Sequence, residues 1–62
     1  MKKLKIKFFP IVYVGFDGFP NNIVQFIESL KPKDFIDIKI DNAFRGIDYY
    51  NITIIYQKDE EN

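Results

Sequence analysis

The side chains able to do chemistry are few in this chain of 62 residues. It has no His, Cys or Trp, and its single Ser, Thr and Arg are Ser29, Thr53 and Arg45. Ser29 has no His or Cys to activate it, so nucleophilic catalysis is not expected. The same two absences remove the ligands that most often hold transition metals. The sequence therefore predicts a protein that is not an enzyme and that holds no metal or other cofactor.

Two acidic or glycine-rich patterns could also support chemistry, but their spacing argues against it. Asp37 and Asp41 fall on one face of a predicted strand, about 13 Å apart by strand rise, too far to share a cation or to act as paired carboxylates. Gly15-Phe16-Asp17-Gly18 lacks the third Gly of a dinucleotide fingerprint and the Lys-Ser/Thr of a P-loop, and Asp17 would repel phosphate. We interpret that stretch as an ordinary turn.

The charge of the chain balances, with nine basic and nine acidic side chains. The lysines crowd residues 2–7 and alternate with Leu4 and Ile6, which is typical of the solvated face of a strand, so nucleic acid is not an expected partner. Residues 58–62 are mostly acidic and predict a disordered tail. Because no apolar stretch is long enough to cross a membrane and no cleavage-site pattern follows the lysines, we expect a cytoplasmic protein without a membrane partner.

Hydrophobic periodicity predicts four regular elements. Residues 3–9 and 35–41 alternate as half-buried strands, residues 49–57 form a strand that is apolar on both faces, and Pro10 ends the first strand or confines it to a sheet edge. Residues 22–31 carry apolar side chains at helical spacing, and Pro32 ends that helix. Residues 15–20 and 42–48 are predicted loops.

These elements predict one α+β domain over residues 1–62, with the order strand, helix, strand, strand. The last strand is the most apolar, so we place it in the centre of a three-stranded antiparallel sheet, between the first and second strands, with the helix on one face. The predicted core consists of large aliphatic and aromatic residues from every element: Leu4, Ile6, Phe8, Ile23, Phe26, Ile27, Leu30, Ile36, Ile38, Ile40, Ile52 and Ile54.

A surplus of large apolar side chains remains outside that core. Either these residues form an interface, or residues 11–19 fold back over the open sheet face and bury Tyr49 and Ile55 within one chain. Because a domain this small without disulfides is marginal alone, we expect a homodimer. The predicted partner-binding surface lies on the two loops, at Phe16, Phe19, Phe44, Arg45 and Tyr49.

Ile36-Asp37-Ile38-Lys39 and Thr53-Ile54-Ile55-Tyr56, with an amphipathic helix before them, resemble a family of very small proteins from spore-forming Firmicutes and their phages, whose bacterial members are small mother-cell sporulation proteins. The resemblance implies a non-enzymatic phage or bacterial accessory protein, most concretely one that inhibits a host defence protein by direct binding. The alternatives are a small-molecule or nucleotide sponge and a small nucleic-acid-binding protein.

Overall fold

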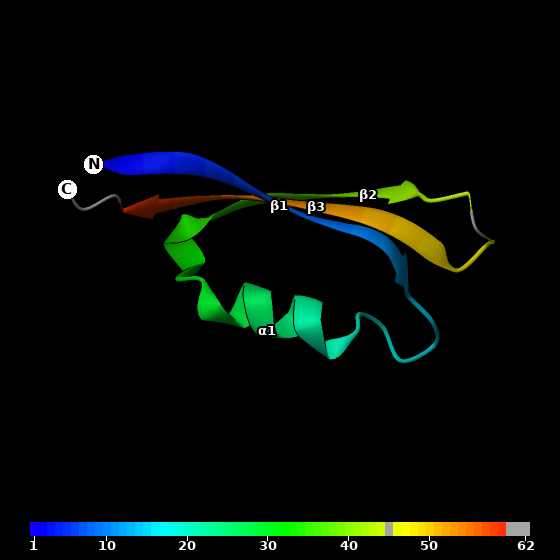
Figure 1. The fold of residues 1–62 in the computed structure, drawn as a ribbon. Helices are drawn as coiled ribbons and strands as arrows, with labels where there is room; N and C mark the ends of the chain where they lie inside the picture. The colour runs from blue at the N-terminus through cyan, green and yellow to red at the C-terminus, as the bar shows by residue number, and fades with distance from the viewer. Residues whose placement is uncertain (45, 60–62) are drawn as a thin grey trace.

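The computed structural model describes residues 1–44 and 46–59, which form a three-stranded antiparallel sheet and one helix. The elements run β1 (Lys2–Tyr13), α1 (Asn21–Ser29), a 3-10 helix η1 (Pro32–Asp34), β2 (Phe35–Asn42) and β3 (Tyr49–Asp59), and the strand order is β1-β3-β2. The predicted fold class and strand order are confirmed. The helix α1 lies against one face of the sheet, and none of the described elements covers the other face (Figure 1).

The central strand β3 pairs with both neighbours along most of its length. Its register runs from Lys2 opposite Asp59 to Tyr13 opposite Tyr49 on one side, and from Phe35 opposite Tyr56 to Asn42 opposite Tyr50 on the other, with a shift between Phe35 and Asp37. Ile52 and Ile54 of β3 are completely buried, which explains why this strand is the most apolar in the sequence. Lys58 and Asp59 of the predicted tail are part of this strand, and residues 60–62 lie outside the described residues.

The helix α1 packs on the sheet through the apolar stripe that the sequence predicts. Ile23 is completely buried, while Phe26, Ile27 and Leu30 are half-buried against the core. The Phe26 ring meets the Phe9 ring edge-on at 6.0 Å between centroids and the Tyr56 ring edge-on at 5.3 Å. Such aromatic pairs contribute about 0.5–1.5 kcal/mol beyond the area they bury.

The start of α1 has no side-chain cap. Asn21 and Asn22 are both of a residue type that commonly caps helices, but the helix begins at Asn21, and the carbonyl of Pro20 accepts hydrogen bonds from the amides of Ile23 and Val24. Proline suits this place because its fixed φ is compatible with the turn that enters the helix.

The buried face of β1 is the opposite of the predicted one. Leu4, Ile6 and Phe8 are 67%, 64% and 53% exposed, so their assignment to the core is wrong. The register explains the difference, because Lys7 lies opposite the buried Ile54, whereas Ile6 lies opposite Ile55 on the uncovered face. Residues paired across an antiparallel ladder share a face of the sheet.

Lys7 on the helix side of β1 does not point directly into solvent. Its ammonium lies 5.6 Å from the centre of the Phe9 ring and 6.0 Å from that of the Phe26 ring. A lysine can lay its methylene stem along apolar surface and keep its charge at the rim, and an aromatic face attracts that charge. The lysine row can therefore occupy the face that the helix partly covers.

The strand β1 continues past Pro10 because a bulge accommodates the proline. The register shifts between Phe9 and Val12, so Pro10 and Ile11 together lie opposite the single residue Asn51, and β1 has one extra residue in the ladder. Ile11 has a φ of 50°, a region that β-branched residues rarely adopt, and its amide donates to Oδ1 of Asn51 at 2.9 Å. The bulge brings Phe9 and Val12 to the same, helix-covered side of the sheet.

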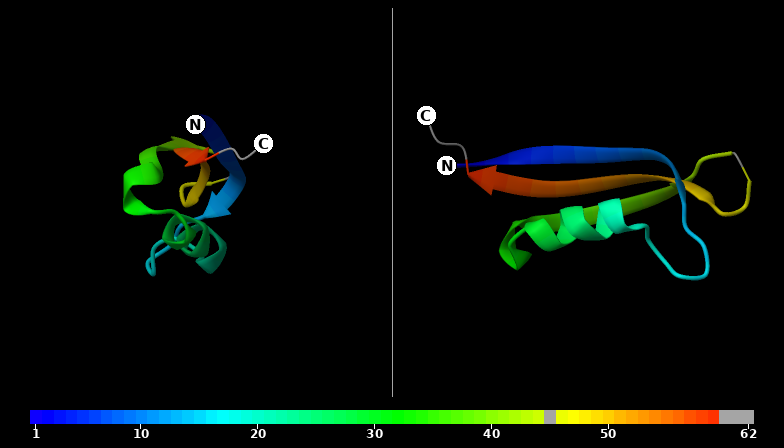
Figure 2. Two further views of the ribbon diagram at one scale, coloured as in Figure 1. Left: turned by 90° about the vertical axis from the view of Figure 1, so that its left-hand side faces the viewer. Right: turned by 60° about the horizontal axis from the view of Figure 1, so that its bottom comes forward.

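The edge strand β2 is less buried than predicted. Ile36 and Ile40 are each 48% exposed, so they do not belong to the core, while Ile38 is half-buried against it. One short helix cannot cover all three strands, and β2 is the strand at the far edge of the sheet from β1. The core is thus centred on β3, the bulge of β1 and the helix (Figure 2).

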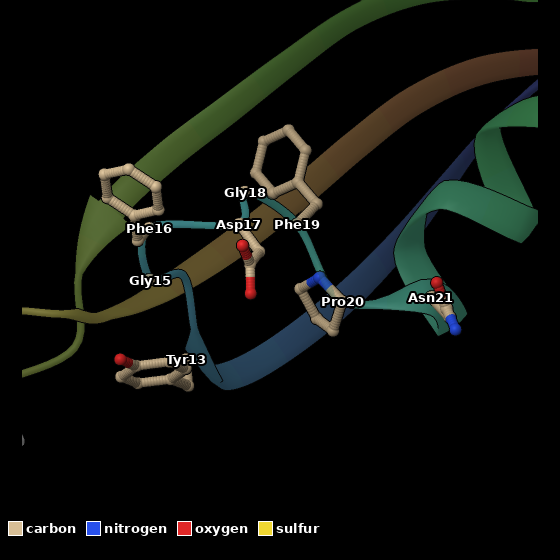
Figure 3. Close-up of a pocket in the computed structure, with 8 residues that line it drawn as sticks. All are labelled: Tyr13, Gly15, Phe16, Asp17, Gly18, Phe19, Pro20 and Asn21. Atoms are coloured by element: carbon tan, nitrogen blue, oxygen red, sulfur yellow. The ribbon is translucent and has the colours of Figure 1, made fainter.

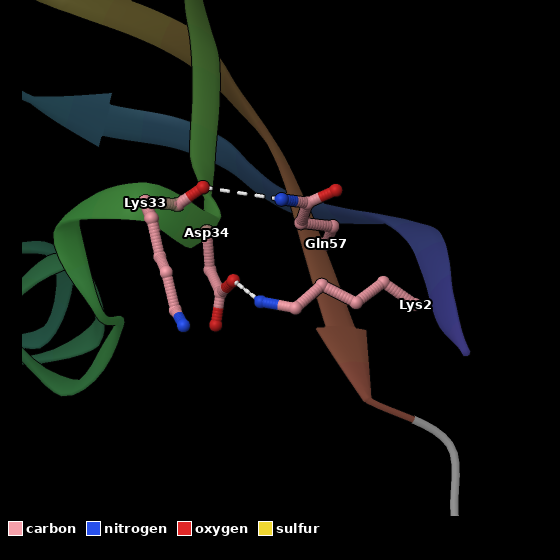
Figure 4. Close-up of polar contacts among 4 residues, drawn as sticks. All are labelled: Lys2, Lys33, Asp34 and Gln57. Atoms are coloured by element: carbon pink, nitrogen blue, oxygen red, sulfur yellow. Dashed lines mark hydrogen bonds and ion pairs between the residues drawn. The ribbon is translucent and has the colours of Figure 1, made fainter.

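Polar contacts link the start of β1 and the end of β3 to η1 (Figure 4). Lys2 forms an ion pair with the carboxylate of Asp34, and the side-chain amide of Gln57 donates to the carbonyl of Lys33 at 3.1 Å. The hydrogen bond from Lys2, assisted by the positive charges of neighbouring lysines, lowers the pKa of Asp34 below its ordinary value against the opposing effect of partial burial. This ion pair therefore links the first strand to the connection between α1 and β2.

Acid should remove the contribution of this ion pair to stability. Because the pKa of Asp34 is lowered in the folded state, the contribution is complete above the pKa of the unfolded chain, near pH 4, and is lost as pH falls through the lower folded value. We expect Asp34→Asn to lower the melting temperature at pH 7 and to lower it less at pH 2, because acid protonates the carboxylate of the wild type. Thermal melts followed by circular dichroism at both pH values measure this. Lys2→Met should behave alike and add little in the double variant, and an Asp34→Asn effect of equal size at both pH values would contradict the assignment.

Candidate protein-binding surface

Two irregular connections meet at one end of the sheet, away from the chain termini (Figures 1 and 2). The first joins β1 to α1 and the second joins β2 to β3. The amide of Val14 donates to the carbonyl of Asp48 at 2.9 Å, and that of Ala43 donates to the carbonyl of Tyr49 at 3.0 Å, so both loops are anchored near this edge. We call the described residues 13–19 and 43–49 the loop end.

Phe16 is at the tip of the first connection and is fully exposed. It lies in a tight turn that the amide of Gly18 closes by donating to the carbonyl of Gly15 at 3.0 Å. Gly18 has a φ of 87°, which a side chain would disfavour. In Figure 3 the rings of Phe16 and Phe19 point to one side of this loop, and that of Tyr13 points to the other.

Phe19 differs from Phe16 because it is half-buried and packs against the core. The segment after Tyr13 turns toward the helix side of the sheet, where Val14 also packs against the core. It therefore does not fold back over the open sheet face, as one of the two sequence-based alternatives proposed. Phe19 has a structural role that the sequence did not reveal, since no helix or strand period includes it.

Phe44 and Ile47 give the second connection its apolar surface, being 93% and 84% exposed. Phe44 has a φ of 60°, and its amide donates to Oδ1 of Asn42 at 2.8 Å, which holds this unusual backbone in place. Arg45, the predicted anchor between them, lies outside the described residues. Sequence reasoning missed Ile47, although a large apolar residue directly after Gly46 in a predicted loop was a signal for it.

Tyr49 is half-buried at the base of the loop end, where its ring packs against that of Tyr13. The two rings meet edge-on at 5.5 Å between centroids. The Tyr13 ring also covers Gly15 so closely that a Cβ at Gly15 would lie 2.6 Å from the ring. Gly15 is thus required for this close approach, and the tyrosine pair forms a firm base beneath the exposed Phe16.

An open pocket of about 480 Å³ lies along the first connection, lined by residues 13 and 15–21 (Figure 3). Asp17 is the one charged residue of this lining, so the pocket has a negative charge. Because the pocket lies between the exposed Phe16 and the half-buried Phe19, it is suited to receive an apolar or cationic group. An anion such as phosphate would be repelled.

Compared with known protein families, curated proteins and solved structures, the chain matches none. Among the residues that the structure describes, no helix is long and apolar enough to cross a membrane. The functional conclusion therefore depends on the geometry of the chain itself.

Proposed function

We propose that the chain is a non-enzymatic binding protein that engages another protein through its loop end, and that it acts as a homodimer. The observation that carries the proposal is the exposure of three large apolar side chains, Phe16, Phe44 and Ile47, on two loops at one end of the sheet. Burying a side chain of this size contributes about 1.5–3 kcal/mol, so exposed groups gathered in one region favour association.

A protein fits this surface better than a nucleic acid or a nucleotide. The two carboxylates in the loop-end segments, Asp17 and Asp48, outnumber their single Arg, Arg45, and carboxylates repel phosphate. Apolar side chains supported by packed aromatic residues are typical of the centre of a protein–protein interface. The narrower role, inhibition of a host defence protein by a phage or bacterial accessory protein, stays a prediction from the family resemblance.

Truncation of either exposed ring should weaken partner binding without unfolding the protein. Hot-spot truncations cost about 2 kcal/mol or more, which corresponds to a dissociation constant raised about 30-fold, whereas exposed-loop changes alter stability by about 0.5 kcal/mol or less. We therefore expect Phe16→Ala and Phe44→Ala each to lose a protein that the wild-type chain captures from lysate of its source organism. Quantitative mass spectrometry of the captured proteins measures the loss, and thermal melts verify that both variants are folded.

The matched control is Ile36→Ala, which removes an exposed apolar side chain from β2, outside the loop end. It should capture the same protein as the wild type. Equal capture by the wild type, Phe16→Ala and Phe44→Ala would exclude the loop end as the binding surface.

A further inference from the structure

The uncovered face of the sheet has an apolar stripe along one strand and charges along another. Leu4, Ile6 and Phe8 of β1 are all more than half exposed, and the register places Ile55 of β3 beside Ile6. This face lies opposite the helix, as Figures 1 and 2 show. On soluble monomers such a stripe is normally covered by a second layer.

The chain exposes more surface than a compact monomer of its size. Its accessible surface is 4943 Å², whereas about 4,200 Å² is typical of a folded monomer of this mass. Its radius of gyration is 13.0 Å, compared with about 10.6 Å for a compact domain of this length. The excess surface is close to the roughly 800 Å² that each partner contributes to a standard interface. The shape is that of a sheet lacking its second layer.

Pairing through the edge of β1 is a poor way to supply that layer. Two β1 strands joined edge to edge around a two-fold axis would bring their lysine rows together on the helix side, where like charges oppose the contact. Edge pairing would also leave both uncovered faces exposed. Packing of the faces avoids both difficulties, because the lysines then point away from the interface.

Two rows of residues across the open face suit a symmetric partner. The first row joins Ile6, Ile55 and Asp37, and the next joins Phe8, Thr53 and Lys39, as the pairing registers of β1 and β2 with β3 specify. Consider two such faces packed against each other around a two-fold axis. The axis lies between the two sheets and runs perpendicular to the strands. It passes beneath the row of Ile54, midway between the two rows just described. This operation exchanges the two rows, while each strand faces its own copy in the antiparallel direction.

We propose that two copies of this chain pack through their open sheet faces around that axis. Ile6 of each copy then meets Phe8 of the other, and Asp37 of each copy meets Lys39 of the other. Opposed sheets lie about 10 Å apart, a distance that an Asp and a Lys side chain together can span. The interface is self-complementary in both apolar shape and charge.

The rows on either side of these two central rows are also compatible with this axis. Gln57 of one copy falls opposite Asn51 of the other, and each amide keeps donor and acceptor capacity beyond its hydrogen bond within its own chain, to Lys33 and Ile11 respectively. Leu4, which is paired with Gln57, falls opposite the bulge that contains Pro10 and Ile11. Thus neither of the two central rows places like charges against each other, and the β2 charges lie at the rim, where interfaces are typically polar.

Charge reversal tests this arrangement. Because the axis doubles every contact, Asp37→Lys or Lys39→Asp alone should place two like-charge contacts in each dimer and raise the dimer dissociation constant at least about tenfold. The double variant carrying both changes restores opposite charges and should return the constant close to that of the wild type. Sedimentation velocity from low micromolar to submillimolar concentration measures all four proteins.

An apolar test complements the charge test. Phe8→Lys should give a monomer, while Ile47→Lys, an equally disruptive change on an exposed loop outside the face, should leave the dimer intact. A monomeric wild type at submillimolar concentration overturns the proposal, and so does failure of the double charge variant to restore association. If the wild type is monomeric and Phe8→Lys abolishes capture of a different protein, the face belongs to that partner.

This inference deepens the homodimer of the proposed function but is independent of the loop end. Phe16→Ala should lose the captured partner and remain dimeric. The two proposals can therefore be tested separately. Capture of a partner reports on the loop end, and self-association reports on the open sheet face.

Discussion

Replacing Ile54 with Ala is expected to remove most of the free energy of unfolding of the protein. Ile54 is completely buried in the central strand, between the helix and the two neighbouring strands. Removing such a side chain costs about 2–5 kcal/mol, because the transfer energy is lost and a cavity remains. A single core in a domain of this size rarely supplies more than about 3–5 kcal/mol. Urea unfolding followed by far-ultraviolet circular dichroism measures the difference.

The control for Ile54→Ala is Ile47→Ala, which removes the same atoms from a loop where they are 84% exposed. It should change the free energy of unfolding by about 0.5 kcal/mol or less. If both variants unfold at the same urea concentration as the wild type, the buried centre of β3 does not carry the stability of this fold.

The order of the elements could be predicted because long-range and local signals agree. The strand over residues 49–57 is apolar on both of its faces, which only a central strand requires. The helix stripe of Ile23, Phe26, Ile27 and Leu30 has one orientation that buries all four residues. In both elements the pattern itself specifies the side that is covered.

The face of β1 could not be predicted from its pattern. Strict alternation establishes that the two faces differ, but it does not decide which one the helix covers. The usual rule that charged residues face solvent selects Leu4, Ile6 and Phe8, and it fails because Lys7 can lie along the Phe9 and Phe26 rings. A dimer through the open face would reconcile the pattern with the fold, since the apolar row would be buried there.

The bulge in β1 and the burial of the loop residues could not be predicted from the sequence, for a different reason. A bulge of one extra residue changes which face the following side chains occupy, and nothing around Pro10 and Ile11 indicates that a residue is inserted there rather than the strand ending. Phe16 and Phe19 are chemically identical and three residues apart, yet one is fully exposed and the other packs against the core. Only the path of the chain after Tyr13 distinguishes them.

Adjacent phenylalanines in β1 provide a direct test of its orientation. Phe9→Ala is expected to destabilise the protein by about 2–3 kcal/mol, below the usual cost of removing a fully buried phenyl ring because Phe9 is only partly buried. Phe9 packs against the core, and its ring meets that of Phe26. Phe8→Ala should cost about 1 kcal/mol or less in the monomer, because Phe8 is 53% exposed on the open face. Urea unfolding at a chain concentration well below the dimer dissociation constant compares the two variants.

At higher concentration, the same pair of variants also distinguishes the core of the monomer from the dimer interface. Where the wild type is dimeric, Phe8→Ala should lose stability relative to the wild type as concentration rises, because stabilisation by association grows with chain concentration and this variant associates less. Phe9→Ala should be destabilised at every concentration. If Phe8→Ala is instead the more damaging change in dilute solution, the helix covers the row of Leu4, Ile6 and Phe8, and the lysine row faces solvent as the alternation alone would suggest.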